Sequence, residues 1–402
     1  MKKIYYSLAD YGKAEINKVN EVLKKNSLSL MNGQNVKLFE SKVAKLFGKK
    51  YGVMVNSGSS ANLLALASLE LKKGSEVITP ILTFSTTVSP ILQLNLVPVF
   101  TDIDKNKFLI SLKNIEKLIT KKTKVIMAPN LLGNIADWEK LKMIAKKYNL
   151  ILLEDSADTI GYKINKKING KFSDIVTSSF YASHIITAAG FGGIVCFNDR
   201  KLFEIAKIMR GWGRQSAITD EKESYKIRFN NKINNHTYDS KYFFTKNGYN
   251  FLPSEISAAF GLEQLSKLES RLKKRKKNFI FLKKYLKKHH NDYFHLPLQQ
   301  ENTDSAWLAF PMVLKINKKN LRNMLQHFLE KRNIQTRAIF SGNVTKQPFM
   351  KNEKYKLKKG ISDNANLIMK NGILIGCHQL LKLNQLKYMC SSITQFVNKN
   401  PK

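Results

Sequence analysis

The sequence predicts an α/β fold in which a mostly parallel sheet, covered by helices on both faces, forms a large N-terminal part. Short apolar strand-like runs alternate with helix-like segments through roughly the first 250 residues, a pattern typical of parallel sheets with helical crossovers. After that point a long basic helix leads into mixed strand and helix signals. We therefore expect a large domain over residues 1–250 and a small α+β C-terminal domain over residues 251–402.

The individual elements are predicted from hydrophobic periodicity and from the polar turns between them. In the first part, helix-like segments are expected at residues 36–47, 60–71 and 137–148. Strand-like runs are expected at 53–56, 76–80, 97–100, 124–129 and 150–155. In the second part, the helix at 254–288 is followed by a strand at 306–315, a helix near 321–331 and a strand at 372–377.

Composition excludes several classes of protein. The chain has 402 residues, of which 43% are hydrophobic, so it can bury a large core and is too apolar to be disordered. No apolar run is long enough to span a membrane, and residues 1–15 lack the apolar stretch of a signal peptide. The three cysteines lie far apart without a C-x-x-C pair. We expect a cytoplasmic protein with no membrane segment, disulfide framework, zinc site or iron–sulfur cluster.

The net charge of +38 is large, and such a charge can indicate a nucleic-acid or membrane partner. The lysines, however, are spread along the whole chain as K-K and K-x-x-K in helix-like segments. That pattern favours a solvated basic surface, and no RNA-binding aromatic signature or zinc-finger spacing accompanies it. We expect no nucleic-acid partner, although an anionic substrate would be attracted.

Three polar motifs follow predicted strand ends, where ligands of open α/β sheets bind. In N-S-G-S-S-A-N-L-L-A-L (56–66), the start of a helix at Ser59 or Ser60 could cradle a phosphate, with Gly58 allowing close approach, or could be an ordinary serine cap. In E-D-S-A-D (154–158), a carboxylate could hold a cationic ring nitrogen or could cap a helix. In T-F-S-T-T (83–87), Phe84 could stack on a planar ring or lie in the core.

A histidine stands out in a fourth stretch, S-S-F-Y-A-S-H-I-I-T-A-A-G-F-G-G (178–193). His184 lies in a polar, glycine-flanked turn after a strand, which suits a proton carrier near neutral pH, although a lone histidine is usually structural. The other six histidines show no metal-ligand spacing.

The motifs occur in an order that resembles the DegT/StrS-type sugar aminotransferases. The resemblance covers nearly the whole chain and implies the fold-type I, aspartate aminotransferase-like fold of pyridoxal-phosphate (PLP) enzymes. It includes F-E-x-x-x-A-x-x-F-G (39–48), S-G-S-S-A-N (57–62), P-V-F-T-D-I-D (98–104), L-L-G-N (131–134), G-W-G-R (211–214), G-Y-N (248–250), A-A-x-G-L-E-Q-L (258–265), S-G-N-V-T-K-Q-P (341–348) and I-G-C-H-Q (375–379).

Most members of that family have a Schiff-base lysine where this chain has His184. The histidine version resembles a smaller branch, the nucleotide-sugar 3-dehydratases. A histidine cannot form a stable imine, so the resemblance implies a cofactor held noncovalently as PLP or its amine form, PMP. It also implies that His184 acts as the base that directs the reaction to loss of the hydroxyl at C3 of a 4-keto-6-deoxy sugar, in deoxysugar or lipopolysaccharide biosynthesis. The cysteines of the iron–sulfur members of this branch are missing, since Ala157 stands in E-D-S-A-D.

The resemblance also implies roles for other residues. It implies that Asp155 pairs with the pyridine nitrogen and that Phe84 stacks on the cofactor ring. It also implies that Asp158 lies near the ring hydroxyl or the reacting centre. Gly58, Ser59 and Ser179 are expected to bind the cofactor phosphate. The asparagine of G-Y-N comes from the neighbouring subunit in relatives, so Asn250 implies a homodimer with shared sites.

Two features concern the small molecules that the site would bind. The substrate is expected to be a nucleotide sugar, with a GDP-linked sugar favoured and other nucleotides left open. Glutamate is a possible amino donor that would restore PMP, but Leu252 stands where relatives often have a basic residue. Arg337 or Arg214 could receive the glutamate carboxylate instead. An aminotransferase of the same fold and a noncatalytic nucleotide-sugar or cofactor binder remain the alternatives.

Overall fold

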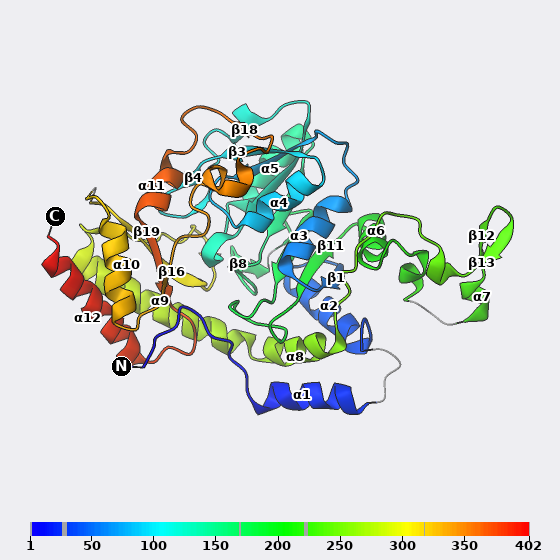
Figure 1. The fold of residues 1–402 in the computed structure, drawn as a ribbon, viewed down its shortest axis with the longest axis horizontal. Coiled ribbons are helices and arrows are strands. Elements are labelled where there is room, and N and C mark those ends of the chain that lie inside the picture. The colour runs from blue at the N-terminus through cyan, green and yellow to red at the C-terminus, as the bar shows by residue number, and fades with distance from the viewer. Residues whose placement is uncertain (1, 26–29, 169, 221–223, 317, 402) are drawn as a thin grey trace.

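A computed structural model describes residues 2–25, 30–168, 170–220, 224–316 and 318–401. Its central feature is a sheet of eight strands, which contains all five strands expected in the first part (Figure 1). In spatial order the strands are β1 (Tyr51–Val55), β11 (Gly193–Phe197), β10 (Ile175–Ser179), β7 (Ile151–Asp155), β6 (Thr123–Pro129), β2 (Glu76–Pro80), β3 (Val97–Thr101) and β18 (Lys356–Leu357). β11 runs antiparallel to both of its neighbours, and the other pairs are parallel. The mostly parallel sheet is therefore confirmed.

Helices cover both faces of this sheet because side chains alternate between the faces along each strand. Val53 and Val55 of β1 pack in one cluster with α3 (Gly58–Ala67) and α6 (Arg200–Arg210). Met54, between them, packs in another cluster with α2 (Gln34–Leu46) and α5 (Trp138–Tyr148). The remaining helices of this part are α1 (Lys13–Lys24), α4 (Ser85–Gln93) and α7 (Tyr225–Arg228).

The C-terminal part is built on a four-stranded antiparallel sheet in the order β14 (Phe294–His295), β16 (Ala309–Leu314), β19 (Gly372–Gly376), β17 (Thr336–Arg337). Its helices are α9 (Leu268–His290), α10 (Leu321–Lys331), α11 (Asp363–Asn371) and α12 (Leu383–Lys399). Ile4, near the N-terminus, belongs to the same buried cluster. The N-terminal segment therefore lies against the C-terminal part of the chain (Figure 1).

Three small sheets of short strands lie outside these two larger sheets in the described ranges. They are β4 (Ile103–Asp104) with β5 (Leu109–Ile110), β8 (Lys163–Ile164) with β9 (Lys167–Ile168) and β15 (Thr303–Asp304), and β12 (Asn231–Ile233) with β13 (His236–Tyr238). The β12–β13 hairpin projects from the body of the molecule, at the right of Figure 1.

The long helix expected at 254–288 is two helices, α8 (Glu255–Ser266) and α9, which meet at Lys267. Lys267 departs from helical geometry, with φ −98° and ψ 1°. The break lets the two helices pack against different partners. α8 contacts α1 and α2, whereas α9 contacts α12 and β16. The division at residue 250 stays a prediction.

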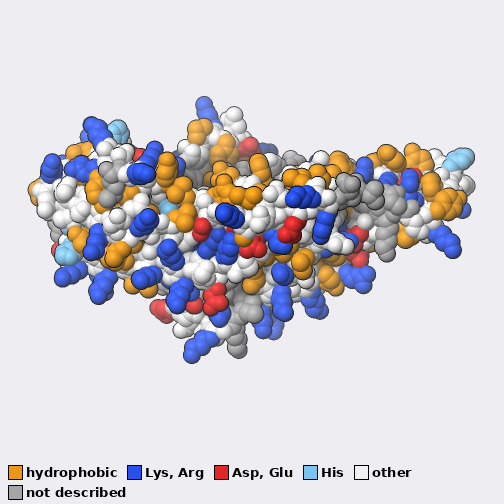
Figure 2. Space-filling view, turned by 90° about the horizontal axis from the view of Figure 1, so that it is seen from below, with side chains coloured by type: hydrophobic (Ala, Val, Ile, Leu, Met, Phe, Trp, Pro, Cys, Tyr) orange, Lys and Arg blue, Asp and Glu red, His pale blue; other side chains and the backbone are white. Residues whose placement is uncertain are grey.

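The surface carries its positive charge without one dominant patch on the face that Figure 2 shows, where lysine and arginine side chains lie scattered among hydrophobic and uncharged ones. Within the described ranges, no helix combines the length and the apolarity that crossing a membrane requires.

Candidate active site

A cavity of about 770 Å³ lies at the carboxyl ends of the parallel strands, between the large sheet and the C-terminal part of the chain. Seven of the eight predicted site residues line it. They are Gly58, Ser59, Phe84, Asp155, Asp158, Ser179 and His184. They come from four separate segments, and the fold brings them together because parallel strands end at one edge of the sheet.

The N-terminus of α3 forms one wall. The helix begins at Gly58, slightly earlier than expected, and the Ser57 side chain caps it by accepting from the backbone N–H of Ser60. A Cβ atom on Gly58 would lie 2.4 Å from Cβ of Ser179, so only glycine allows α3 to approach the end of β10 this closely. Ser59 and Ser179 thus flank a helix N-terminus that attracts anions.

Asp155 ends β7 and is held in a fixed orientation. Its Oδ2 accepts from Nδ2 of Asn62 and from Oγ1 of Thr87, both at 2.9 Å, and its Oδ1 accepts from the backbone N–H of Ala157 at 3.1 Å. Burial raises the pKa of Asp155, and these hydrogen bonds oppose the rise. Among the described residues no lysine or arginine forms an ion pair with it. A cation placed beside Asp155 would favour the charged form of this buried carboxyl group.

Phe84 immediately precedes α4 and projects into the cavity. Its side chain is 54% exposed, which excludes the core position that the sequence left open. Its ring meets that of Phe340 edge-on, with the centroids 6.2 Å apart. The two rings therefore line one cavity, Phe84 after the end of β2 and Phe340 in the C-terminal part of the chain.

His184 lies in the turn after β10, and its Nδ1 is 3.1 Å from the carbonyl oxygen of Ser179. A carbonyl oxygen can only accept, so Nδ1 carries the hydrogen. In the neutral ring Nε2 is then the unprotonated nitrogen, with a free lone pair. The turn thus presents the side chain in the tautomer that a base requires.

Asp158 is the nearest acid to His184, with 4.0 Å between Oδ1 of Asp158 and Nε2 of His184. Oδ2 of Asp158 accepts from the backbone N–H of Leu132 at 2.8 Å. Burial raises the pKa of Asp158 to about 7, with a smaller contribution from the charge of Asp155. Burial lowers the pKa of His184 to about 4. The pair can therefore hold or release one proton at the edge of the cavity.

No lysine lines this cavity in the part of the chain that the structure describes, and Arg337 is the one lysine or arginine there. Arg337 Nη1 donates to the carbonyl oxygen of Thr336 at 2.8 Å, and the guanidinium lies 5.7 Å from the centre of the Tyr6 ring. The site therefore offers a histidine, two carboxylates, a helix N-terminus and one arginine.

The sequence profile of the DegT/DnrJ/EryC1/StrS aminotransferase family matches residues 9–394. The chain belongs to this family. It is 36% identical over 382 residues to the lipopolysaccharide biosynthesis protein RfbH of Salmonella typhimurium, covering 92% of this chain and 87% of that protein. It is 34% identical over 366 residues to the GDP-4-keto-6-deoxy-D-mannose 3-dehydratase of Escherichia coli O55:H7, covering 89% and 91%.

A solved structure of this family superimposes closely. It is a GDP-4-keto-6-deoxymannose-3-dehydratase with a trapped PLP-glutamate geminal diamine, and it matches with a TM-score of 0.86 at 30% sequence identity. The match covers 97% of this chain and 99% of that one. The family membership and the aminotransferase-like fold expected from the sequence are thus confirmed.

The residues of this family member fit a pyridoxal-phosphate type of cofactor. The buried Asp155 carboxylate lacks a cation among the described residues, and a pyridinium nitrogen would supply one. The α3 N-terminus, closed by the approach of Gly58 to Ser179, suits a phosphate. The cavity wall at Phe84 suits a planar ring.

Asn250 is the predicted site residue that the fold does not bring to this cavity. It is exposed and pairs with Gly211 in an isolated antiparallel bridge. Arg214 is also outside the cavity, and its guanidinium lies 4.3 Å from the centre of the Trp212 ring. Leu252 does not line the cavity either.

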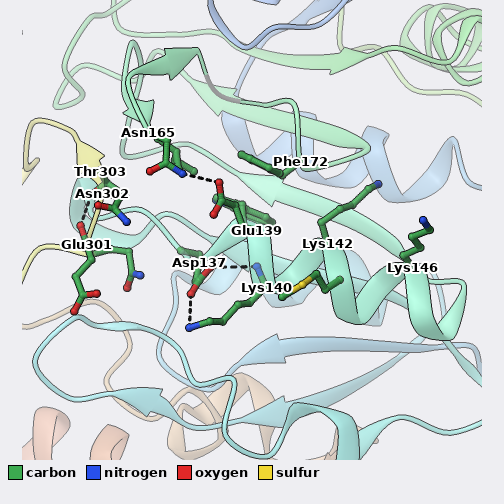
Figure 3. A pocket seen from close by; sticks show the side chains of 15 residues that line it. Asp137, Glu139, Lys140, Lys142, Lys146, Asn165, Phe172, Glu301, Asn302 and Thr303 are labelled. Atoms are coloured by element: carbon green, nitrogen blue, oxygen red, sulfur yellow. Dashed lines mark hydrogen bonds and ion pairs between the residues drawn. The ribbon is translucent and has the colours of Figure 1, made fainter.

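A second hollow, of about 600 Å³, lies between α5 and residues 300–303 (Figure 3). Two pairs of its polar side chains bond to each other. Asn165 donates to Glu139 at 2.7 Å, and Lys140 forms an ion pair with Asp137 at 3.1 Å. The hollow contains none of the predicted site residues, so the first cavity is the candidate active site.

Cysteine and metal chemistry find no support in the described ranges. No group of three or more His, Cys, Asp or Glu residues there is arranged to hold a metal ion. Cys196, Cys377 and Cys390 are buried and unbonded to one another.

Sequence reasoning missed three residues of the site. Asn62 and Thr87 lie in motifs already singled out. Asn62 lies one helical turn after Gly58 in α3, which places it toward the cavity, and Thr87 lies in the first turn of α4. Tyr6 has no such signal, because the N-terminal segment reaches the cavity only through tertiary contacts.

Proposed function

We propose that the chain is a PLP/PMP-dependent lyase that removes the C3 hydroxyl of a nucleotide-linked 4-keto-6-deoxyhexose. The observation that carries this proposal is His184. Its Nδ1–H is committed to the Ser179 carbonyl, its Nε2 faces the cavity, and none of the described lining residues is a lysine. A base stands where an aminotransferase would need an amine.

The residues that would hold the cofactor come from four strand ends, those of β1, β2, β7 and β10. Asp155 would face the ring nitrogen, Phe84 the ring, and Gly58, Ser59 and Ser179 the phosphate. When bound, pyridoxamine phosphate would supply an amine for the 4-keto group and a ring that accepts electrons as the C3 hydroxyl leaves.

The chain's own contribution to the reaction is proton handling. Neutral His184 can take a proton at Nε2, and the carbonyl of Ser179 keeps the ring in place as the charge develops. The Asp158 carboxylate, 4.0 Å away, would stabilise the resulting imidazolium. The imidazolium can then return the proton to the leaving hydroxyl.

GDP is the favoured nucleotide, because the similar 3-dehydratases include enzymes named for a GDP sugar. Glutamate is the favoured amino donor. Since Leu252 and Arg214 lie outside the cavity and Arg337 lines it, we assign the glutamate carboxylate to Arg337. Replacement of Arg337 by alanine should slow the glutamate half-reaction, and an unchanged rate would contradict the assignment.

Mass spectrometry of a panel of 4-keto-6-deoxy nucleotide sugars, GDP-linked first, tests the function directly. After incubation with PMP-loaded protein, a loss of about 16 Da with release of PLP is the expected result. A gain of about 1 Da would mean that the keto group had become an amine, and the chain would be an aminotransferase. No change in any sugar would favour a noncatalytic binder.

We also propose a homodimer in which Asn250 completes the site of the other subunit. This explains why Asn250 is exposed and absent from its own cavity. Mixing the inactive variants His184→Asn and Asn250→Ala gives a sharp test, because a mixed dimer would hold one intact site. Random pairing should then restore about a quarter of the wild-type activity. If Asn250 acted within its own chain, mixing would restore none.

A further inference from the structure

The N-terminal strap, residues 4–10, is held firmly against the C-terminal part of the chain. Ile4 forms a parallel bridge with Ile334, and the backbone N–H of Tyr6 donates to Oε1 of Gln335 at 2.9 Å. At the other end, Asp10 forms an ion pair with Arg271 at 3.3 Å. Figure 1 shows this dark blue segment running beside the C-terminal helices before it reaches α1. Its position is therefore defined at both ends.

The strap also contacts the turn that carries His184. Oγ of Ser7 donates to the carbonyl oxygen of Ser183 at 2.8 Å, next to His184 in the chain. The contact joins two segments 176 residues apart. The strap therefore contacts the turn that presents His184.

Tyr6 is the strap residue that lines the cavity. Its hydroxyl forms no hydrogen bond within the described part of the chain. Burial and the nearby Asp158 raise the pKa of Tyr6 above its ordinary value, whereas Arg275 and Arg337 oppose the rise. The phenol therefore stays neutral and keeps its hydrogen at physiological pH. Tyr6 is only partly buried and lines the cavity, so a ligand there can accept the hydrogen of its unpaired hydroxyl.

We propose that Tyr6, presented by the N-terminal strap, donates a hydrogen bond from its hydroxyl to the sugar of the substrate. The large-domain wall, with Asp155, Phe84 and Ser179, suits the cofactor. The sugar must then lie between that wall and the opposite one, where Tyr6 and Arg337 meet.

This inference rests on the proposed function. It adds Tyr6, from the N-terminal strap, to the residues that would bind the substrate. Sugar hydroxyls both donate and accept, so a neutral phenol is a suitable partner for them.

The test is Tyr6→Phe, which keeps the ring and its contact with Arg337 and removes only the oxygen. Tyr5→Phe is the matched control, because Tyr5 is the neighbouring tyrosine, is 41% exposed and does not line the cavity. With the 4-keto sugar nucleotide that the wild type converts, Tyr6→Phe should lower kcat/KM about tenfold. Tyr5→Phe should leave it unchanged. Thermal stability and the PLP absorbance spectrum should be the same in all three proteins.

Equilibrium binding separates this inference from the proposed function. Tyr6→Phe should weaken binding of the GDP-linked sugar about tenfold and leave binding of GDP alone unchanged. If the wild type turns over and Tyr6→Phe matches it in both assays, the inference is wrong and the function stands. If the wild type converts no sugar, the function is wrong, and the binding difference between GDP-sugar and GDP still decides the role of Tyr6.

Discussion

Replacing Asp158 by asparagine should change how the free energy of unfolding of the cofactor-free protein depends on pH. The pKa of Asp158 rises from 3.8 to about 7 on folding, so the folded state binds a proton that the unfolded state releases between these values. The resulting stabilisation is fully present below about pH 4 and is lost as pH rises through about 7. At about 1.4 kcal/mol for each pH unit, the loss amounts to about 4 kcal/mol.

His184 has the opposite effect on the pH dependence of folding stability. Its pKa falls from 6.5 to about 4 on folding, so the unfolded state binds the extra proton between these values. Stability from this residue therefore rises with pH, by about 3 kcal/mol between about pH 4 and 6.5. In the wild type the two slopes nearly cancel, and each single variant should uncover the slope of the residue that remains.

Guanidinium unfolding of the cofactor-free proteins at about pH 4.5, 5.5 and 6.5 would measure these slopes. Relative to the wild type, Asp158→Asn should become more stable as pH rises, and His184→Asn should become less stable. The double variant, which has lost both groups, is the control and should show neither slope. An Asp158→Asn variant that follows the wild-type pH dependence would refute the reasoning, because it would mean that Asp158 does not take up a proton on folding.

Three further predictions concern catalysis and cofactor binding. His184→Asn should lower kcat by about 10²–10⁴ without weakening cofactor binding, because it removes the base but can keep a donor to the Ser179 carbonyl. Single-turnover mass spectrometry measures the loss of rate. Asp155→Asn should weaken PLP binding in absorbance titrations by at least about tenfold, because the buried carboxylate that offsets the ring charge is gone. Gly58→Ala should destabilise the protein by about 1–3 kcal/mol and weaken PLP binding, because the new Cβ would meet Ser179. Adding Ser179→Gly removes the side chain that the new Cβ would meet and should restore part of the stability in guanidinium unfolding; additive losses of stability in the double variant would contradict this contact.

Much of the fold could be predicted from the sequence, because it depends on local patterns. Apolar runs of strand length alternating with amphipathic segments predicted the parallel sheet and its helical cover, and the helix expected near 321–331 is α10. The break at Lys267 was not predicted. Both halves of 254–288 have strong helical patterns, and only the different packing partners of α8 and α9 require a kink.

Sequence motifs also determined most of the candidate site. Short polar motifs at strand ends pointed to Gly58, Phe84, Asp155 and His184, because the carboxyl edge of a parallel sheet gathers such turns in one place, and the family resemblance added Ser179. The substitution of histidine for the family's lysine, visible in one residue, predicted a base in place of an amine.

Other properties were decided only by tertiary structure. The tautomer of His184 depends on the carbonyl of Ser179, and the raised pKa of Asp158 depends on burial, which no local pattern encodes. Tyr6 reaches the cavity only because its strap packs against residues more than 300 positions away, such as Gln335, 329 positions along the chain. Sequence by itself determined which groups can do the chemistry. Tertiary structure determined their protonation, their neighbours and which of them a substrate can touch.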